Sequence, residues 1–194
     1  MNLALSPSTS RRLALALLLV LLAGVLVLRM TGTPSSALPD RVLGVAQGAP
    51  DGLDGAVGDL SLTIDDHRHP AISGLDPALR DAVATANAAA ARDGIQVRIT
   101  SGWRSEGYQE RLLERAIREY GSEQEARRWV ATPLTSAHVR GDAVDVGPTD
   151  AAYWMQQHGS DFGLCQVFAN EVWHYELLTT PGGSCPPMRT DGAS

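Results

Sequence analysis

Two histidines and an aspartate of this chain have types and spacings that suit a metal site. His138 and Asp145 lie seven positions apart in the segment 136–145, and His174 follows nearly thirty residues later. Two imidazoles and one carboxylate are a common protein ligand set for catalytic zinc, which keeps a fourth position for water. Glu171 lies three residues before His174 and offers the further carboxylate that metal-assisted hydrolysis needs as general base. Together these residues predict one hydrolytic zinc site.

Each of these residues, taken alone, has a simpler structural explanation. His138 suits an exposed loop, His174 suits a hydrogen-bonded core histidine, and Glu171 suits a solvated loop carboxylate. Asp145 lies between two valines. A buried carboxylate there is costly unless a cation or strong donors meet it, although hydrogen bonds to a turn would also serve. The prediction therefore depends on the joint occurrence of all four residues in one small domain.

Local patterns indicate which elements position these side chains. Gly141 and the valine-rich run 143–146 argue against a helical ligand pair. We therefore expect His138 in a loop, followed by a glycine turn and then a strand that carries Asp145. His174 lies in a strand-like run and shares a face with Glu176, which either orients the imidazole or faces water.

The remaining patterns predict a mixture of helices and strands. The Asp76-Pro77 pair predicts the start of a helix at 77–92, and Ser122 and Glu125 form a capping box that predicts another, short helix. Further helices are expected at 105–120 and 149–158. Strands are expected at 95–100, 143–146, 165–168 and 173–178. Because these elements do not alternate regularly, we predict an α+β fold with helices packed on a small, mostly antiparallel sheet.

The N-terminus differs from the rest of the chain. Arg11 and Arg12 precede an apolar run at 13–28, and Arg29 closes it, which is the pattern of an export signal. The run is short for a spanning helix of about 20 residues. Because Arg29 argues against efficient cleavage, we expect an uncleaved signal-anchor within residues 1–30 rather than a removed signal peptide. The arginines would stay inside and the domain outside the membrane.

The sequence after this segment divides into a linker, a domain and a tail. Residues 31–60 are rich in Gly, Pro, Ala and Ser and predict a flexible linker. We expect the zinc peptidase domain at 61–188 and a tail at 189–194.

Charge and cysteine content limit the partners and the compartment. The net charge is −6, and without the three N-terminal arginines 13 basic residues face 22 acidic ones. Such an acidic domain argues against nucleic-acid binding, which needs a basic face. Cys165 and Cys185 are the only cysteines, so an exported domain would pair them in a disulfide, with two free thiols as the alternative.

Three segments resemble one known family of enzymes. SAHVRGDAVD at 136–145 and EVWHYE at 171–176 resemble the two signatures of the D-alanyl-D-alanine carboxypeptidase (VanY-like) zinc peptidases. SGWRSEGYQ at 101–109 resembles a third block of that family, and all three occur in the family's order.

The resemblance implies a fold, an activity and roles for particular residues. The fold would be Hedgehog/DD-peptidase-like, and the activity removal of a C-terminal D-amino acid from peptidoglycan stem peptides in the bacterial cell envelope. Zn²⁺ would be held by His138, Asp145 and His174, with Glu171 as the catalytic base. Arg104 would meet the substrate as an oxyanion donor or a carboxylate clamp, while Gln109 and Ser136 line the pocket.

Other functions remain open at this point. An endopeptidase or a D,D-dipeptidase acting on similar peptides would use the same residues. A non-catalytic cell-wall binding module could share the fold, although a pure binder need not keep Glu171. We expect a monomer whose partners are peptidoglycan stem peptides and, through the N-terminal helix, the membrane.

Overall fold

The computed structural model of this chain describes residues 52–60 and 62–194. The expected signal-anchor and most of the expected linker lie outside the described residues. Within the described part, no helix has both the length and the apolar character needed to cross a membrane.

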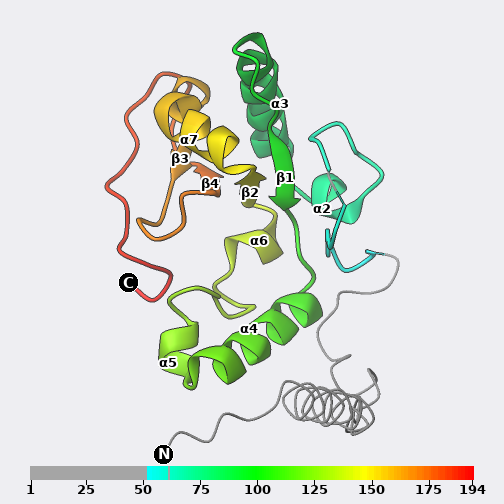
Figure 1. Cartoon of the computed structure of the whole chain (residues 1–194), viewed down its shortest axis with the longest axis vertical. Helices are drawn as coiled ribbons and strands as arrows, with labels where there is room; N and C mark the ends of the chain where they lie inside the picture. Colours follow the sequence, from blue (N-terminus) through cyan, green and yellow to red (C-terminus); the bar gives the residue numbers. More distant parts are fainter. Residues whose placement is uncertain (1–51, 61) are drawn as a thin grey trace, which may run out of the picture. The chain divides into compact units, whose positions relative to one another are not determined.

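A four-stranded antiparallel sheet forms the centre of the domain (Figure 1). Its strands are β1 (Arg98–Ser101), β2 (Ala143–Gly147), β3 (Leu164–Gln166) and β4 (His174–Leu177). Their spatial order is β1-β2-β4-β3, so β2 and β4 are central and the other two form the edges. The register places Ser101 opposite Asp145, and Asp145 opposite His174, in one row at the same end of the sheet.

Helices cover the sheet and extend beyond it. The long helix α3 (Pro77–Arg92) and α7 (Thr149–His158) pack against each other and against the strands. The shorter elements are α2 (Pro70–Ser73), α5 (Glu123–Ala126), α6 (Ala137–Arg140) and the 3-10 turn η1 (Gly159–Phe162), and α4 (Glu106–Tyr120) packs chiefly on α5. The prediction of helices packed on a small antiparallel sheet is confirmed.

Alternation along the central strands separates the core from the opposite face of the sheet. Val144 and Val146 of β2 and Tyr175 of β4 belong to the main apolar cluster with the helices. Because successive side chains of a strand point to opposite faces, Asp145 and His174 point away from that cluster. The Tyr175 hydroxyl donates to the carbonyl of Ala152 in α7 at 2.9 Å, which fixes β4 against the helical layer. The sheet therefore presents its polar side chains on the face opposite α3 and α7.

Capping residues set the limits of the two long helices, and the predicted Asp76-Pro77 start is present. The Asp76 carboxylate accepts hydrogen bonds from the amides of Ala78 and Leu79, and Pro77 is the first residue of α3. Ser105 caps α4, and Gly121 ends it in the left-handed conformation. Side-chain oxygens satisfy amides at helix N-termini, and glycine tolerates the positive φ at the C-terminus. Local chemistry thus sets the limits of both helices.

Two local predictions were wrong. The first strand begins at Arg98 rather than at residue 95, because the amide of Ile95 instead donates to the carbonyl of Ala90 at the end of α3. His138 lies on the one-turn helix α6 rather than in a loop, and Gly141 ends that turn with φ of 80°. Gly141 supplies the expected turn, but the chain coils once before reaching it.

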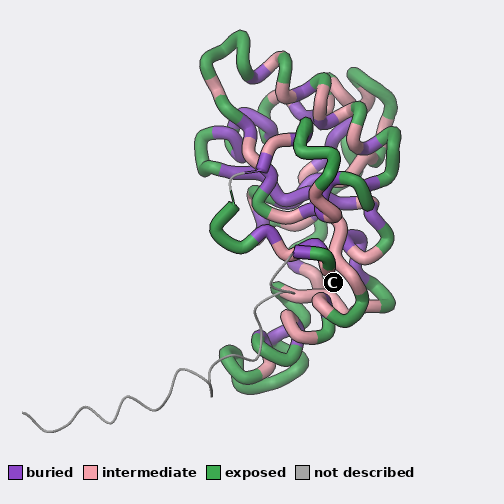
Figure 2. Tube along the Cα trace, turned by 90° about the vertical axis from the view of Figure 1, so that its right-hand side faces the viewer, coloured by how far each residue is buried: buried purple, intermediate pink, exposed green. Residues whose placement is uncertain are grey.

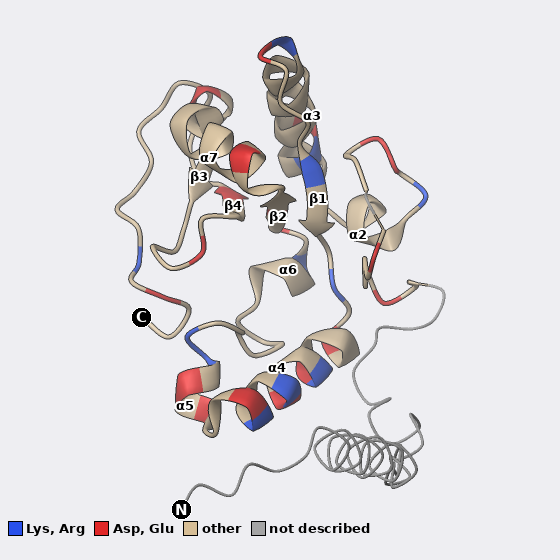
Figure 3. Ribbon diagram, in the orientation of Figure 1, with Lys and Arg blue, Asp and Glu red and all other residues tan. Residues whose placement is uncertain are grey.

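The α4–α5 segment has its own small apolar cluster, made of Leu113, Ala116 and Ala126. Figure 2 shows that buried positions concentrate in the sheet and its helices, whereas α4–α5 is mostly exposed or half-buried. Acidic and basic positions are interspersed along α4, whereas the charged positions of α5 are all acidic (Figure 3). This segment is therefore a satellite layer and not part of the main core.

Candidate metal centre

Three buried side chains from three different elements bring their ligand atoms together. His138 of α6, Asp145 of β2 and His174 of β4 each offer one atom, and these atoms all lie within 4.8 Å of one another. The Nε2 atom of His138 lies 3.2 Å from Nδ1 of His174, and Oδ1 of Asp145 lies 3.3 and 3.1 Å from these two nitrogens. Within the described residues, this is the one group of three that could hold a metal ion.

Hydrogen bonds on the far side of each imidazole fix which nitrogen faces the cluster. Nδ1 of His138 donates to the carbonyl of Gly102 at 2.8 Å, which leaves the lone pair of Nε2 on the inner side. Nε2 of His174 donates to Glu176 at 3.2 Å, which leaves Nδ1 on the inner side. Such outer partners orient metal-binding imidazoles and raise their basicity. Glu176 thus contacts His174 and does not simply face water.

Close backbone packing holds the His138 segment in place. A Cβ on Gly102 would lie 2.0 Å from the carbonyl oxygen of Ala71, so only glycine fits beside α2. A Cβ on Gly141 would lie 2.4 Å from the carbonyl oxygen of Gly74. The amide of Arg104 also donates to the carbonyl of His138 at 3.2 Å. The backbone that carries His138 is therefore held on both sides.

Arg104 contacts the aspartate of the cluster. Its Nη2 donates to Oδ2 of Asp145 at 2.9 Å, while Oδ1 of that carboxylate faces the histidines. Nε donates to the Ser101 hydroxyl at 2.8 Å, and Nη1 donates to Oε1 of Gln109 at 3.1 Å. Since a guanidinium has five N–H donors, further donors remain for a ligand. Arg104 thus orients Asp145 so that one carboxylate oxygen is left for the cluster.

The ionisation of the cluster follows from its burial and its charges. Burial alone would raise the pKa of Asp145, but His138, His174 and Arg104 together lower it well below its usual range. Burial also lowers the pKa of His138 and keeps that ring neutral. For His174, burial is outweighed by Asp145 and Glu176, and its pKa rises to about 9. Without a metal, the cluster therefore holds a carboxylate, a neutral imidazole and an imidazolium.

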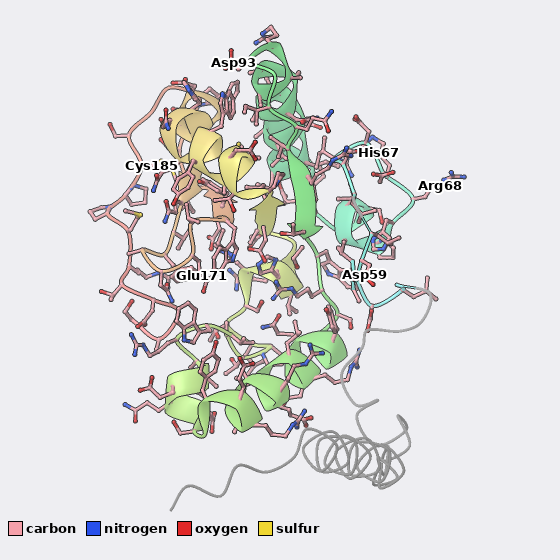
Figure 4. The ribbon with its side chains drawn as sticks, viewed as in Figure 1. Asp59, His67, Arg68, Asp93, Glu171 and Cys185 are labelled. Atoms are coloured by element: carbon pink, nitrogen blue, oxygen red, sulfur yellow. A yellow bond between two sulfur atoms is a disulfide. The ribbon has the colours of Figure 1, made fainter. Side chains whose placement is uncertain are left out.

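Glu171 lies beside this cluster in the turn that leads into β4 (Figure 4). Its side chain is buried, and Oε2 lies 3.9 Å from Nδ1 of His174. Burial raises the pKa of Glu171 to about 7, even though the charge of His174 acts in the opposite direction. A carboxyl group in this state can accept and return a proton near neutral pH.

A cavity of about 570 Å³ opens onto the cluster. Arg104, Gln109 and Ser136, for which the family resemblance implies contact with the substrate, all line it, as do the three clustered residues and Glu171. The lining also includes Tyr120 and Trp129, whose rings stack with centroids 6.1 Å apart. The volume lies in the range of sites that enclose small organic ligands.

Sequence reasoning missed several contributors to this site. The carbonyl of Gly102, which orients His138, has no side chain and so leaves no compositional signal. Phe168, whose ring centroid lies 5.1 Å from that of His174, was assigned only to a strand. Arg189 lines the cavity although the expected tail began at that residue. For these positions, only the path of the backbone brings them to the site.

The disulfide between Cys165 and Cys185 is present. Cys165 lies on β3, and Figure 4 shows Cys185 on the C-terminal segment beside the sheet. The bridge closes a loop of 20 residues that contains both Glu171 and His174.

The donor set suits a divalent metal of the borderline class. Two imidazole nitrogens and one carboxylate oxygen converge from buried positions, and each imidazole already has its outer hydrogen-bond partner. Three protein ligands leave at least one coordination position open, as in catalytic rather than structural zinc sites. Both of the cysteines that could compete as ligands are committed to the disulfide.

Comparison with known proteins gives a family match. The family model described as VanY, D-alanyl-D-alanine carboxypeptidase, matches residues 73–180, which include every residue of the cluster. A D-alanyl-D-alanine carboxypeptidase of Enterococcus faecalis (strain ATCC 700802 / V583) is 27% identical over 115 residues, covering 46% of this chain and 43% of that protein. The chain thus matches less than half of the length of this curated relative.

Solved structures share the fold. One is a mutant of the vancomycin resistance D,D-pentapeptidase VanY in complex with Zn(II), which is 24% identical to this chain with a TM-score of 0.50. The match spans 53% of this chain and 71% of the VanY chain. VanYB in complex with D-alanine-D-alanine is 24% identical at the same TM-score, and the match spans 53% of this chain and 70% of the VanYB chain. The LdcB LD-carboxypeptidase is 21% identical with a TM-score of 0.50, and the match spans 65% of this chain and 68% of the LdcB chain.

Proposed function

Because this chain belongs to the VanY family of D-alanyl-D-alanine carboxypeptidases, we propose that it is a zinc-dependent carboxypeptidase of the cell envelope. Its substrates would be peptidoglycan stem peptides, from which it removes a C-terminal D-amino acid, D-alanine. The observation that carries this proposal is the convergence of His138, Asp145 and His174 beside the buried carboxyl group of Glu171.

In this proposal His138 Nε2, Asp145 Oδ1 and His174 Nδ1 hold the metal. When bound, zinc supplies Lewis acidity and lowers the pKa of water toward about 7. The Glu171 carboxylate takes a proton from the attacking water and returns it to the leaving amine. Its burial and its position beside His174 support this role.

Arg104 meets the substrate with the N–H groups that Asp145, Ser101 and Gln109 leave free. It would donate either to the oxygen that gains charge during attack or to the C-terminal carboxylate of the peptide. A donor to that developing charge typically lowers the activation free energy by about 3 kcal/mol. The second role uses the planar fork of the guanidinium. Gln109 and Ser136 support either role as neighbours in the cavity lining.

The cavity favours a peptide longer than a dipeptide. A volume of about 570 Å³ exceeds what two alanine residues occupy, so the site suits the end of a stem peptide. A D,D-dipeptidase or an endopeptidase of the same fold is the alternative. A non-catalytic module is disfavoured because a binding site has no need of a buried carboxyl at Glu171.

The decisive experiment compares peptide substrates with and without a chelator. Purified protein is incubated with stem peptides ending in D-Ala-D-Ala, with tetrapeptides ending in a single D-Ala, and with free D-Ala-D-Ala, and the products are identified by mass spectrometry. We expect metal-dependent release of one D-alanine from a stem peptide. Cleavage of the free dipeptide alone would favour a dipeptidase, and no release from any peptide would favour a binding module.

We also propose an extracytoplasmic location, with the domain anchored in the membrane or secreted. The apolar run 13–28 after Arg11 and Arg12 supports export, and the disulfide supports an oxidising compartment. Fractionation of cells that express the full chain, with protease added outside, tests this location. Protection of the domain from the protease in intact cells would contradict it.

A further inference from the structure

We propose that Arg189 is a substrate-specificity residue that binds a free carboxylate of the peptide on the amino-terminal side of the scissile bond. This inference rests on the proposed function and extends it to the substrate's upstream residues.

The C-terminal segment is fixed against the domain around Arg189. The Arg189 amide donates to the carbonyl of Val167 and its carbonyl accepts from the amide of Ala169, both at 2.9 Å. Upstream, the disulfide ties Cys185 to β3. Downstream, buried Asp191 accepts from Nε of Arg128 at 2.8 Å. The backbone of this exposed arginine is thus held on both sides and does not belong to a free tail.

The Arg189 side chain is held toward the cavity. Its guanidinium lies over the ring of Phe168, 4.5 Å from the centroid, and Phe168 in turn contacts the ring of His174. Stacking on an aromatic face restricts a guanidinium without using its N–H donors, which stay available for a carboxylate. Arg189 therefore presents its donors in the same cavity as the metal cluster.

Arg189 also differs from the other arginines of the lining. Arg104 pairs with Asp145, and Arg140 pairs with Asp142 at 2.7 Å. Among the described residues, Arg189 has no carboxylate partner, although Figure 3 shows acidic and basic positions close together on its segment. Its positive charge in the cavity is therefore left for an anionic group of a ligand.

The sheet topology determines which part of a substrate would reach this arginine. Arg104 follows edge strand β1, Phe168 follows the opposite edge strand β3 and pairs with Arg189, and Asp145 and His174 of the cluster lie between them on β2 and β4. A carboxypeptidase leaves only one residue beyond the cut, and in its role as carboxylate clamp Arg104 would serve that side. The side of Arg189 then receives residues before the cut. In a peptide ending in D-Ala-D-Ala, the third residue from the end is the first that can carry a side-chain carboxylate.

The test compares two peptides that end in D-Ala-D-Ala. They are identical except that the third residue from the end carries a free side-chain carboxylate or its carboxamide. The kcat/KM ratio of acid to amide is measured for wild type, Arg189→Gln, Arg189→Lys and Arg118→Gln. Arg118 is exposed on α4 outside the cavity lining, so its variant removes the same charge elsewhere.

We expect wild type to prefer the acid about three- to tenfold, mainly through KM, with a smaller preference at high salt. Arg189→Gln should bring the ratio near one by slowing the acid peptide only. Arg189→Lys should keep part of the preference, and Arg118→Gln all of it. Calorimetric binding of both peptides to the zinc-loaded Glu171→Gln chain, with and without Arg189→Gln, should give the same ratios without turnover.

The possible failures are distinct. Equal use of both peptides by wild type, or an unchanged ratio in Arg189→Gln, would overturn the role of Arg189 while leaving the proposed activity intact. If neither peptide is cleaved or bound, the proposed function fails and this role fails with it. Equal slowing of both peptides in Arg189→Gln would mean that the residue supports the fold and does not select the substrate.

Discussion

At the residue scale, the cluster is organised by partners outside it. Asp145 directs one oxygen to the histidines and the other to Arg104, while Gly102 and Glu176 set the inner nitrogens of His138 and His174. Each candidate ligand therefore directs one inner atom at the same point. This arrangement is what a preformed metal site requires.

Glu171→Gln separates the proton-transfer role from metal binding. The change keeps the size of the side chain but removes a base whose pKa is raised to about 7 by burial. We expect the variant to keep its zinc and to lose hydrolysis by about 10²- to 10⁴-fold, the usual contribution of a general base. Single-turnover assays with elemental analysis measure both. His174→Ala is the contrasting variant, and it should lose metal and activity together. A fully active Glu171→Gln chain would refute the assigned base.

Metal affinity should depend on pH through His174. Its pKa of about 9 in the metal-free chain means that the ring is protonated below that pH, so binding must displace this proton. Asp145 and His138 need no such change, because the pKa of each is lowered. Affinity should therefore rise with pH, by up to about tenfold per unit, and level off above pH 9.

Competition with a fluorescent chelator between pH 6 and 9 measures this dependence. Glu176→Gln is the matched control, because removing that carboxylate lowers the pKa of His174, so the affinity should level off at a lower pH. An affinity that stays constant over this pH range would contradict the assigned protonation state.

At the element scale, tight turns bring the ligand-bearing segments together. The helix α6 carries His138, Gly141 reverses the chain, and β2 then carries Asp145 beside β1 and β4. The turn works only because Gly141 has φ of 80° and packs against the backbone of Gly74. A substitution at Gly141 should therefore displace both His138 and Asp145.

Gly141→Ala tests this turn, and Gly121→Ala is its matched control. Both glycines have φ of 80°, but an added Cβ at Gly121 meets nothing within 4 Å, whereas at Gly141 it lies 2.4 Å from a carbonyl oxygen. We expect Gly121→Ala to cost about 1 kcal/mol of unfolding free energy from backbone strain alone. Gly141→Ala should cost more and should weaken zinc binding. Urea unfolding and zinc titration measure these effects, and equal behaviour of the two variants would argue against the close packing.

The elements could be predicted where the signal is local. Asp76-Pro77 marked the start of α3, and the valine-rich run marked β2. The predicted limits of the strands were less accurate, because pairing with a neighbouring strand decides where a strand begins and ends. Ile95 is an example, since its amide bonds to the end of α3 and does not extend β1. The convergence of the cluster follows from the β1-β2-β4-β3 order, which no local pattern encodes. The residue types of the candidate ligands could be recognised in the sequence. The places of Arg189 and of the Gly102 carbonyl in the site could not, because they depend on tertiary packing.

At the scale of the whole molecule, the disulfide joins the C-terminal segment to the sheet and encloses the turn with Glu171 and His174. In a domain with one main core, such a cross-link acts chiefly by restricting the unfolded chain. It also keeps the segment that carries Arg189 beside the cavity. The bridge therefore supports both stability and the shape of the site.

Replacing Cys165 and Cys185 together by serine should lower the unfolding free energy by about 3 kcal/mol, the value expected for closing a loop of this length. Thermal unfolding of the double variant, and of wild type with and without a reductant, measures this loss. Reduced wild type should match the double variant, and oxidised wild type should be more stable than both. An unchanged midpoint in the double variant would show that the bridge does not stabilise the fold.

The separate apolar cluster of α4 and α5 has a consequence for how this scaffold can diversify. Asp145 and His174 lie on strands whose apolar residues belong to the main core, while Tyr120 ends α4 and Trp129 follows α5, next to the second cluster. Exchanging the part of that layer that carries Tyr120 and Trp129, while keeping Gln109 beside Arg104, should change which peptides are admitted and leave the proposed reaction unaltered. Part of the selectivity can therefore be inherited, or engineered, separately from the chemistry.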